Sequence, residues 1–202
     1  TDGNISLDEP RERTLRVTHI VGEQYGALYG TYFNRDDQGR IIHEMSQGYP
    51  RPSLNTSRKI LGFGVPPQQL GIGASFRYKD FNASFLVEGK SGGQIFSGTN
   101  VRLIGYGLHQ MTVPAGGREA GFVPNGVMED GTPVTQSLDY SQQQSYWGRY
   151  NDVAEAGIRD SDYFRMRQMA IGYTFPSSML EGAFIEAASV SLIGKNLFFI
   201  TN

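Results

Sequence analysis

The sequence predicts an all-β protein built from antiparallel strands, and three observations support that prediction. The chain contains 26 glycines and 9 prolines in 202 residues, a high proportion that is typical of frequent turns. Aromatic residues make up 12%, nearly all of them tyrosine and phenylalanine, which favour strands. Apolar residues recur with a period of two, and no long segment has the 3.6-residue period of an amphipathic helix.

Composition also narrows the classes of function. The formal net charge is −2, which gives no electrostatic reason to expect a nucleic-acid partner. The chain has no cysteine, so disulfides, thiolate zinc sites and cysteine nucleophiles are excluded. No run approaches 18 apolar residues, but transmembrane β-strands alternate apolar and polar residues and escape that test. Both ends of the chain suggest that it is a piece of a longer one.

The clearest local pattern is a predicted hairpin over 71–89. Apolar residues alternate with small or polar ones on both sides of Lys79-Asp80. With these two residues as the turn, position 78 lies opposite 81, 76 opposite 83, 74 opposite 85 and 72 opposite 87. Each pair joins two apolar residues, and a slip of one position would destroy the agreement, so the register is well specified. Lys-Asp is not a favoured pair for a type I′ turn, and the turn type stays open.

Further strands follow from the same pattern. A strand is predicted over 163–175, where Pro176 ends it by removing a ladder donor, and another over 188–199. Arg165 and Arg167 share the parity of the apolar set in the first of these and are expected to lie beyond the apolar band. Weaker candidates are 14–21, 25–33 and 101–112.

The connections between the strands are very unequal in length. Residues 79–80 form a tight turn, 176–187 a moderate connection, and 90–162 a long polar stretch. Short turns on the periplasmic side and long extracellular loops are typical of outer-membrane barrels. The pattern therefore predicts periplasmic turns at about 79–80 and 176–187 and an extracellular loop at about 90–162. Periodicity alone is explained equally well by a soluble sandwich.

In a barrel, alternate residues of each strand face lipid and lumen. Aromatic side chains near the two turns suit the girdle at the membrane interface. The residues expected to face lipid are Ile72, Phe76, Tyr78, Phe81, Phe85, Val87, Met169, Ile171, Tyr173 and Phe175. The residues expected to face the lumen are Ser75, Arg77, Asn82, Ser84, Glu88, Gln168 and Thr174.

The sequence gives no positive support for an enzyme. The three histidines have no partner at metal-ligand spacing, and the acidic residues of 152–162 lack the calcium-loop pattern. The Gly-x-Gly pairs lack the third glycine of a dinucleotide-binding loop. We therefore predict no catalytic residue, no metal and no cofactor.

One part of the long loop is a candidate contact region for a substrate or a lid. Its aromatic rings could stack on sugars or hold a partner, and the alternative is that they pack the loop against itself. These candidate residues are Tyr140, Tyr146, Trp147, Arg149 and Tyr150.

A series of short motifs follows one another along nearly the whole chain. They are Tyr25-Gly26-Ala27-Leu28-Tyr29-Gly30, Arg35-Asp36 with Gly39, Leu61-Gly62, Pro66, Gly71-Ile72-Gly73, Phe76-Arg77-Tyr78-Lys79-Asp80-Phe81, Gly92-Gly93-Gln94-Ile95-Phe96, Asp130-Gly131-Thr132-Pro133, Tyr163-Phe164-Arg165-Met166-Arg167, Gly172-Tyr173-Thr174-Phe175-Pro176 and Gly194-Lys195-Asn196-Leu197-Phe198. Each motif is weak alone. Their order and spacing resemble the SusC/RagA class of TonB-dependent outer-membrane transporters.

The resemblance implies that the chain is the C-terminal portion, about a fifth, of a transporter whose barrel has about 22 strands. The plug domain and the last strand would lie outside this chain. The expected function is TonB-dependent import of an oligosaccharide or peptide across the bacterial outer membrane. The expected partners are a SusD-like surface lipoprotein as a lid, the TonB complex acting through the plug, and outer-membrane lipid. The alternatives are a soluble extracellular β-sandwich that binds carbohydrate and a small closed barrel of about eight strands.

Overall fold

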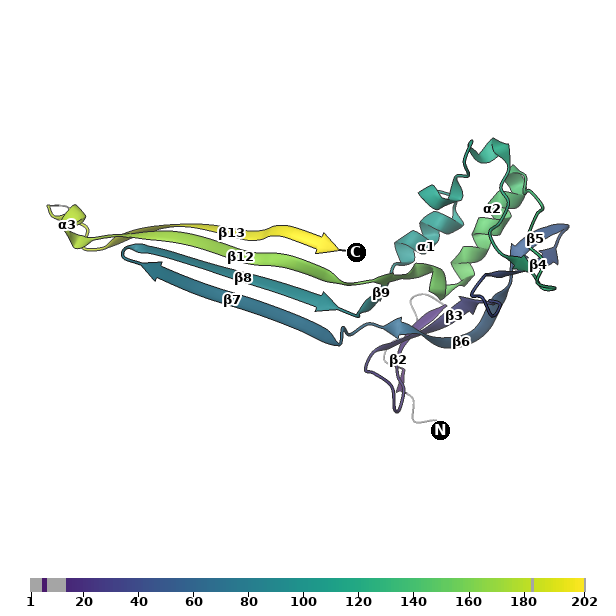
Figure 1. Cartoon of the computed structure of the whole chain (residues 1–202), viewed down its shortest axis with the longest axis horizontal. Coiled ribbons are helices and arrows are strands. Elements are labelled where there is room, and N and C mark those ends of the chain that lie inside the picture. The colour runs from purple at the N-terminus through teal and green to yellow at the C-terminus, as the bar shows by residue number, and fades with distance from the viewer. Residues whose placement is uncertain (1–4, 7–13, 183, 202) are drawn as a thin grey trace. The chain divides into compact units, whose positions relative to one another are not determined.

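The computed structural model describes residues 5–6, 14–182 and 184–201. The chain divides into two compact units (Figure 1). The first unit combines Thr1–Val65 with Gln94–Arg159, and the second combines Pro66–Gly93 with Asp160–Asn202. In the described residues, no helix is both long enough and apolar enough to cross a membrane.

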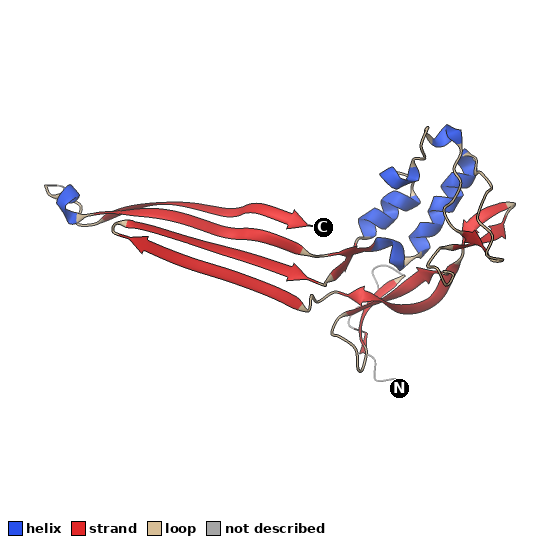
Figure 2. Cartoon of the chain, viewed as in Figure 1, coloured by secondary structure: helices blue, strands red, loops and turns tan. Residues whose placement is uncertain are grey.

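The second unit is a single four-stranded antiparallel sheet in the order β13-β12-β8-β7 (Figure 2). Its strands are β7 (Gln68–Tyr78), β8 (Phe81–Ser91), β12 (Tyr163–Phe175) and β13 (Ala188–Thr201). A short helix, α3 (Ser177–Leu180), begins directly after Pro176. All four strands that the alternating pattern predicts are therefore confirmed.

The predicted register of the β7–β8 hairpin is also confirmed. Tyr78 pairs with Phe81, and Phe76 pairs with Ala83, as the match between apolar positions requires. The turn is made by Lys79 with φ at +51°, in the left-handed region that non-glycine residues occupy infrequently. The hydrophobic pattern therefore sets this register in spite of an unfavourable turn residue.

The expectation that Arg165 and Arg167 share the face of the apolar residues of β12 is wrong, because the strand contains a bulge. The ladder with β8 pairs Arg165 with Glu88 and Met166 with Val87. The next pair is Gln168 with Leu86, so the ladder skips Arg167. An extra residue reverses the parity of the strand on one side of the bulge. Arg165 consequently lies on the face of Gln168 rather than on the face of the apolar residues, and the Arg167 side chain also reaches that polar face to bond Glu88.

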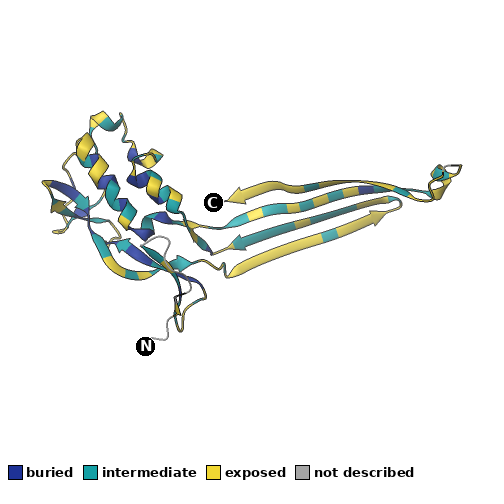
Figure 3. Ribbon diagram, turned by 180° about the vertical axis from the view of Figure 1, so that it is seen from behind, coloured by how far each residue is buried: buried dark blue, intermediate teal, exposed yellow. Residues whose placement is uncertain are grey.

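The sheet therefore has one face without charge and one face that carries all the charges of the four strands. The register aligns the apolar positions across every strand, for example Ile72 with Val87 and Met169 with Phe85. Apolar side chains on this face are exposed in the chain, with Phe76 at 62% and Leu192 at 78%. Most of the ribbon of these four strands has the colours of exposed or intermediate residues in Figure 3. The charged residues of the strands, all on the opposite face, are Arg77, Glu88, Lys90, Arg165, Arg167 and Lys195.

The first unit combines small sheets with short helices. One sheet has the order β1-β2-β3-β6, a second has the order β10-β4-β5, and β9 pairs with β11. The strands are β1 (Ile5–Ser6), β2 (Leu15–His19), β3 (Ala27–Phe33), β4 (Ile42–Ser46), β5 (Tyr49–Pro52), β6 (Leu54–Phe63), β9 (Gln94–Phe96), β10 (Val127–Met128) and β11 (Ile158–Asp160). The helices are α1 (Gly98–Gly105) and α2 (Tyr140–Gly148), with 3₁₀ turns η1 (Gln110–Thr112), η2 (Arg118–Ala120), η3 (Arg149–Asp152) and η4 (Ala154–Gly157).

The weaker predictions for this unit had mixed outcomes. The strands expected at 14–21 and 25–33 are present as β2 and β3. The strand expected at 101–112 is wrong, because this segment forms most of α1 and then η1. Ser97 begins α1 by accepting a hydrogen bond from the backbone of Asn100, which is a typical N-cap.

Helix α2 supplies much of the core of the first unit. Asp139 accepts a hydrogen bond from the Gln142 backbone at 2.9 Å, while the Gln142 side chain accepts one from the Asp139 backbone at 3.0 Å. This capping box fixes the start of the helix. The buried residues that follow are one helical turn apart, so they form one face. The core cluster is Phe33, Tyr49, Ile104, Leu138, Tyr146, Trp147, Tyr150 and Val153.

Strand β3 is joined to the segment after α2 by close backbone approach. The Thr31 hydroxyl donates to the carbonyl of Asp152 at 2.9 Å and accepts from the backbone of Ala154 at 3.1 Å. A Cβ placed at Gly30 would lie 2.6 Å from the Cβ of Ala154, which is too close for two carbon atoms that are not bonded to each other. Only glycine permits this spacing.

His43 is a fully buried titratable residue in this core. Its Nδ1 lies 3.1 Å from the carbonyl of Ile41, so Nδ1 carries the proton and donates to that oxygen. Nε2 then accepts from the Tyr146 hydroxyl, which lies 3.1 Å away. Burial lowers the pKa of His43 from its ordinary value of 6.5, because a charged imidazole would lose its hydration.

We predict that acid destabilises the first unit through His43. Below about pH 6.5 the unfolded chain binds a proton at this residue while the folded unit does not, so stability falls as pH falls. The loss is at most about 1.4 kcal/mol per pH unit and stops below the folded-state pKa. Hydrogen exchange of the 140–153 peptides, corrected for intrinsic rates, should rise between pH 7.5 and pH 5. The same rise in His43→Gln would contradict the assignment.

Candidate functional site

The structure separates the aromatic candidates of the long loop into buried and exposed residues. Tyr146, Trp147 and Tyr150 are buried in the core cluster, where the Tyr146 and Trp147 rings meet edge to face with centroids 5.0 Å apart. Their ring faces therefore pack the unit against itself, which is the alternative that the sequence leaves open. Tyr140, at the start of α2, is 63% exposed. Its role as a contact stays a prediction.

Arg149 follows α2 and connects it to the second small sheet. Its Nη2 donates to Glu44 Oε1 at 2.8 Å and to the carbonyl of Pro52 at 3.3 Å. Glu44 and Pro52 belong to β4 and β5, so the guanidinium holds α2 and these two strands together. This placement gives Arg149 a structural task, and its role as a ligand contact stays a prediction.

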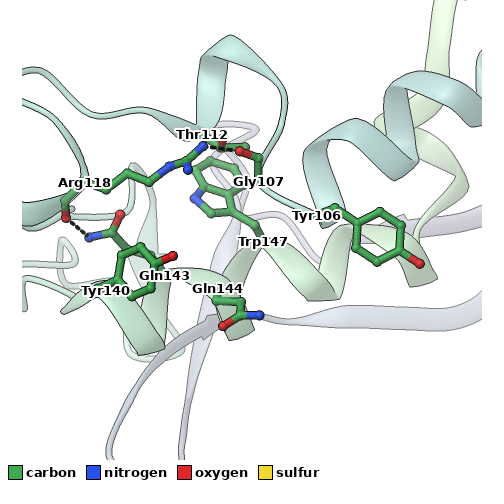
Figure 4. A pocket seen from close by; sticks show the side chains of 8 residues that line it. All are labelled: Tyr106, Gly107, Thr112, Arg118, Tyr140, Gln143, Gln144 and Trp147. Atoms are coloured by element: carbon green, nitrogen blue, oxygen red, sulfur yellow. Dashed lines mark hydrogen bonds between the residues drawn. The ribbon is translucent and has the colours of Figure 1, made fainter.

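A cavity of about 90 Å³ opens beside α2 (Figure 4). It is formed by the end of α1, the two 3₁₀ turns that follow, and α2. All of these segments belong to the first unit. The lining residues are Tyr106, Gly107, Thr112, Arg118, Tyr140, Gln143, Gln144 and Trp147.

The hydrogen bonds around this cavity fix the orientation of the Gln143 amide. Gln143 Nε2 donates to the carbonyl of Arg118 at 3.0 Å and to the carbonyl of Leu138 at 3.1 Å. Both partners accept, so the amide nitrogen must face them and the amide oxygen must face away. The Arg118 guanidinium in turn donates to the carbonyl of Gly107.

Gln143 and Trp147 each contain one buried polar atom that has no hydrogen-bond partner in the described structure. They are the acceptor Oε1 of Gln143 and the donor Nε1 of Trp147. Gln143 is only 3% exposed and Trp147 only 5%. Leaving such groups unpaired costs about 1–3 kcal/mol each, so folded proteins keep few of them.

The sequence did not reveal Gln143. A signal was present, because Asp139 and Gln142 have the spacing of a capping box and thus predict a helix start. A helix that begins there places Gln143 and Trp147 four residues apart, on one face.

The polar face of the sheet in the second unit carries a compact ionic cluster. Glu88 accepts from the Tyr163 hydroxyl at 3.1 Å, from Arg165 Nε at 2.6 Å and from Arg167 Nη1 at 2.7 Å. The Arg165 guanidinium also lies 5.3 Å from the centre of the Tyr163 ring. One carboxylate therefore holds two cations, and the cluster keeps a net positive charge.

The ladder pairs place the residues expected in the lumen on this same polar face. Ser75 pairs with Ser84, and Arg77 pairs with Asn82, in register with Glu88, Gln168 and Thr174 along neighbouring strands. The residues expected to face lipid share the opposite face. The assignment of the polar face to the lumen and of the apolar face to lipid stays a prediction.

The acidic residues of 152–162 take part in contacts within the protein. No group of three or more metal-ligating side chains occurs within residues 5–6, 14–182 and 184–201. Among the acidic residues of 152–162, Glu155 pairs with Arg35 at 2.7 Å. Asp162 accepts from the Ser91 hydroxyl and from the Gly92 backbone, both at 2.8 Å.

We predict that Glu88→Ala weakens the folded sheet, because three donors lose their acceptor and two guanidiniums are left side by side. The measurement is the temperature at which the full-length protein loses its compact mobility on a denaturing gel. Removing one of the repelling cations in Glu88→Ala/Arg167→Ala should restore part of the loss. Equal stability of Glu88→Ala and the unmodified protein would contradict the role of the cluster.

Comparisons with known proteins bear on the identity of this fold. No family model matches the chain. The TonB-dependent receptor P3 of Formosa agariphila is 23% identical over 205 residues, a region that covers 93% of this chain and 19% of the relative. The RagAB peptide importer in its open-open state is similar with a TM-score of 0.55 and 15% identity, over 96% of this chain and 20% of that chain.

A further structure, of the RagAB peptide transporter, has a TM-score of 0.55 and 13% identity, over 98% of this chain and 21% of that chain. The chain thus spans about a fifth of the length of the proteins it resembles. The likeness extends over almost all of the present chain, in both of its units. The fold of the chain is therefore that of a segment of a SusC/RagA-like, TonB-dependent transporter, as its motifs indicate.

Proposed function

We propose that this chain forms part of the wall and the outer loops of a TonB-dependent importer in the bacterial outer membrane, with an oligosaccharide or a peptide as cargo. The observation that carries the proposal is the separation of charge between the two faces of the sheet in the second unit. The structural likeness to the RagAB peptide importer supports it.

The uncharged face has the chemistry that lipid requires. A charged side chain facing the bilayer midplane costs about 2–4 kcal/mol for Lys or Arg, so lipid-facing positions exclude charge. From Leu70 to Tyr78, and across the paired positions of β8, β12 and β13, the described strands carry no charged residue on this face. A lumen tolerates charge because it is wet, and the six charged strand residues are all on the other face.

The height of the apolar face also fits a membrane. Phe164 and Phe198 stack near one end with centroids 6.2 Å apart, and Phe81 and Tyr173 lie 4.7 Å apart near the other. Phe164 and Tyr173 are separated by 173 − 164 = 9 positions, which is about 30 Å along a strand. A strand tilt of about 40° reduces this to about 23 Å of depth, close to the apolar band of about 25 Å between aromatic girdles.

The free edges of the sheet support a larger barrel over the two alternatives. Within the described residues, β7 and β13 each pair on one side only. Strands of 11 and 14 residues with an open edge invite further pairing. A soluble sandwich needs a second sheet over the apolar face, and the described residues of this unit form one sheet. A small barrel would need bulky side chains inside, whereas Gly71, Gly73 and Ser75 are small.

The first unit, by this proposal, forms the outer loops around the entrance. A SusD-like surface lipoprotein would cover the entrance as a lid, and the TonB complex would act through the plug outside this chain. The names of the structural neighbours support a peptide importer, because RagAB is described as a peptide importer in open-open and closed-closed states. No enzymatic step is part of the proposal.

Uptake by cells tests the proposal directly. A strain that lacks the full-length protein should lose growth on one class of nutrient, either oligosaccharides or oligopeptides, as sole source. Loss of TonB should give the same defect, and an affinity-tagged transporter extracted in detergent should retain a surface lipoprotein. Full growth on both nutrient classes, together with recovery of the protein in the soluble fraction, would refute the proposal.

We predict that Phe85→Lys prevents barrel assembly, because it places a charge near the middle of the apolar face at a cost of about 2–4 kcal/mol. Ser84→Lys is the matched control, since it introduces the same lysine at the preceding position, which lies on the polar face. The measurement is the amount of heat-modifiable protein in the outer-membrane fraction. Equal assembly of the two variants would show that the two faces are assigned wrongly.

A further inference from the structure

We propose that the polar face of the sheet in the second unit carries a binding site for a carboxylate group of the transported cargo. This inference rests on the proposed function and adds the chemistry that the cargo must carry. The site lies where β8 ends and β12 begins. We call this the outer end of the sheet, because the segment between these two strands is assigned to the outer loops. The cationic residues of the site are Lys90, Arg165, Arg167 and Lys195.

Charge on the polar face is strongly unbalanced. Across the four strands this face carries five cationic side chains and a single carboxylate, that of Glu88. The ladder places Lys90, Arg165 and Lys195 in three successive rows, and Arg167 is the bulge between the last two. The fifth cation, Arg77, pairs with Asn82, which is 88 − 82 = 6 positions from Glu88 along β8, or about 20 Å. The excess of positive charge is therefore concentrated at the outer end.

The two arginines keep free N–H groups after they bind Glu88. Arg165 donates to it through Nε at 2.6 Å and Arg167 through Nη1 at 2.7 Å, so one carboxylate is shared between two guanidiniums. In the described residues, Arg165 Nη1 and the Nε and Nη2 of Arg167 have no acceptor. The Arg167 side chain is 56% exposed, so a ligand can reach it. A guanidinium is a planar fork of donors that matches the two oxygens of a carboxylate.

The two lysines of the site have no anionic partner within the described part of the chain. Neither Lys90 nor Lys195 forms a hydrogen bond or an ion pair there. Asp162, which lies just before β12, instead accepts from the Ser91 hydroxyl and the Gly92 backbone. The carboxylates near this end of the sheet are thus engaged elsewhere, and the positive charge of the lysines adds to that of the arginines.

Further strands of a larger barrel would not flank most of these cations. Strand β8 lies between β7 and β12, and β12 lies between β8 and β13. Every strand beside Lys90, Arg165 and Arg167 is therefore described, and an anionic group can reach them only from the open side of the polar face. By the proposed function that side is the lumen, so the group belongs either to the cargo or to the plug.

The position of the cations and a neighbouring ring favour the cargo. Cargo enters from the outer end, where the cations gather, whereas the row through Ser75, Ser84 and Ala170 nearer the other end carries no charge. The Phe199 ring lies beside the cations, because Phe199 pairs with Arg165. It stacks on Tyr163 with centroids 5.3 Å apart and is 59% exposed. An exposed ring next to charged donors offers an apolar contact for the carbon atoms that bear a carboxylate.

Both classes of cargo can carry a carboxylate, an oligosaccharide as a uronic acid and a peptide as an acidic side chain. The test is binding of two matched pairs of probes to the purified full-length transporter in detergent, measured by calorimetry. One pair is trigalacturonic acid and its methyl ester, and the other is acetyl-triglutamate amide and acetyl-triglutamine amide. The two members of a pair differ in charge and have nearly the same shape.

At least one anionic probe should bind about ten times more tightly than its neutral counterpart, because several cations act on it. The difference should shrink as salt is added, since ions screen exposed charges. The pair that shows the difference identifies the class of cargo. Equal binding within both pairs would overturn the proposal.

Arg167→Gln removes an exposed cation and keeps a polar side chain, so it should weaken binding of the anionic probe about two- to fivefold. Arg77→Gln is the matched control, since it makes the same change on the same face about 20 Å from the site. The control should leave binding unchanged. An equal loss in the two variants would show that the whole face attracts anions diffusely, and the proposal of a discrete site would be wrong.

The two lysines separate a ligand site from a contact with the plug. The double variant Lys90→Gln/Lys195→Gln removes no contact within the described residues, so it should weaken binding of the anionic probe and leave heat stability on a denaturing gel unchanged. Lower heat stability with unchanged binding would assign these cations to carboxylates of the plug and overturn the proposal.

The outcome for this site can be told apart from the outcome for the importer. The binding measurements need neither TonB nor uptake. Selective binding of an anionic probe by a protein that is recovered in the soluble fraction would refute the importer alone. TonB-dependent uptake by a transporter that binds both members of each pair equally would refute the carboxylate site alone.

Discussion

The alternation of side chains along a β-strand is the constraint on which the second unit depends. Successive residues point to opposite faces, so two neighbouring positions can meet two different solvents. The ladder joins Phe85 to Met169 and Ser84 to Ala170, which keeps apolar next to apolar and small or polar next to small or polar across the sheet. Because the pairing keeps the faces matched on both sides of the bulge, no charge in one strand is placed among the apolar residues of the next.

The bulge at Arg167 shows how this constraint is maintained near the end of the ladder. Without the extra residue, Arg165 would share a face with Met169 and Ile171. The skipped residue moves Arg165 to the side of Glu88, where the carboxylate accepts hydrogen bonds from both arginines. The same step brings Met166 opposite Val87, so the uncharged face extends past the bulge. A local irregularity therefore preserves the long-range pattern.

The sequence predicted the strands whose apolar residues alternate strictly, and it did not predict the elements whose structure depends on tertiary packing. The ends of β12 and the pairs of the β7–β8 hairpin could be predicted, because an apolar pattern with period two admits one register. The bulge could not, since parity counting assumes an unbroken strand. Helix α2 is too short at nine residues for its period to stand out among aromatic residues, and α1 was mistaken for a strand.

The candidate site was harder to predict for a related reason. Its aromatic residues could be located in the sequence, but whether Trp147 points its ring or its N–H outward depends on what covers the helix. The two partners of the Gln143 amide group are Arg118, which belongs to η2, and Leu138, which lies just before α2. Such a set of neighbours is created by tertiary structure and has no spacing signature in one sequence.

The interleaving of the two units along the chain has a consequence for biogenesis. Thr31 bonds the backbone of Asp152 and Ala154, more than 120 positions later, and the whole β7–β8 hairpin lies between them in the sequence. The first unit cannot complete its fold until this hairpin and the long segment after it have both been synthesised. Until that later segment has been synthesised, the first part of the unit lacks the partners of Thr31 and remains incompletely folded.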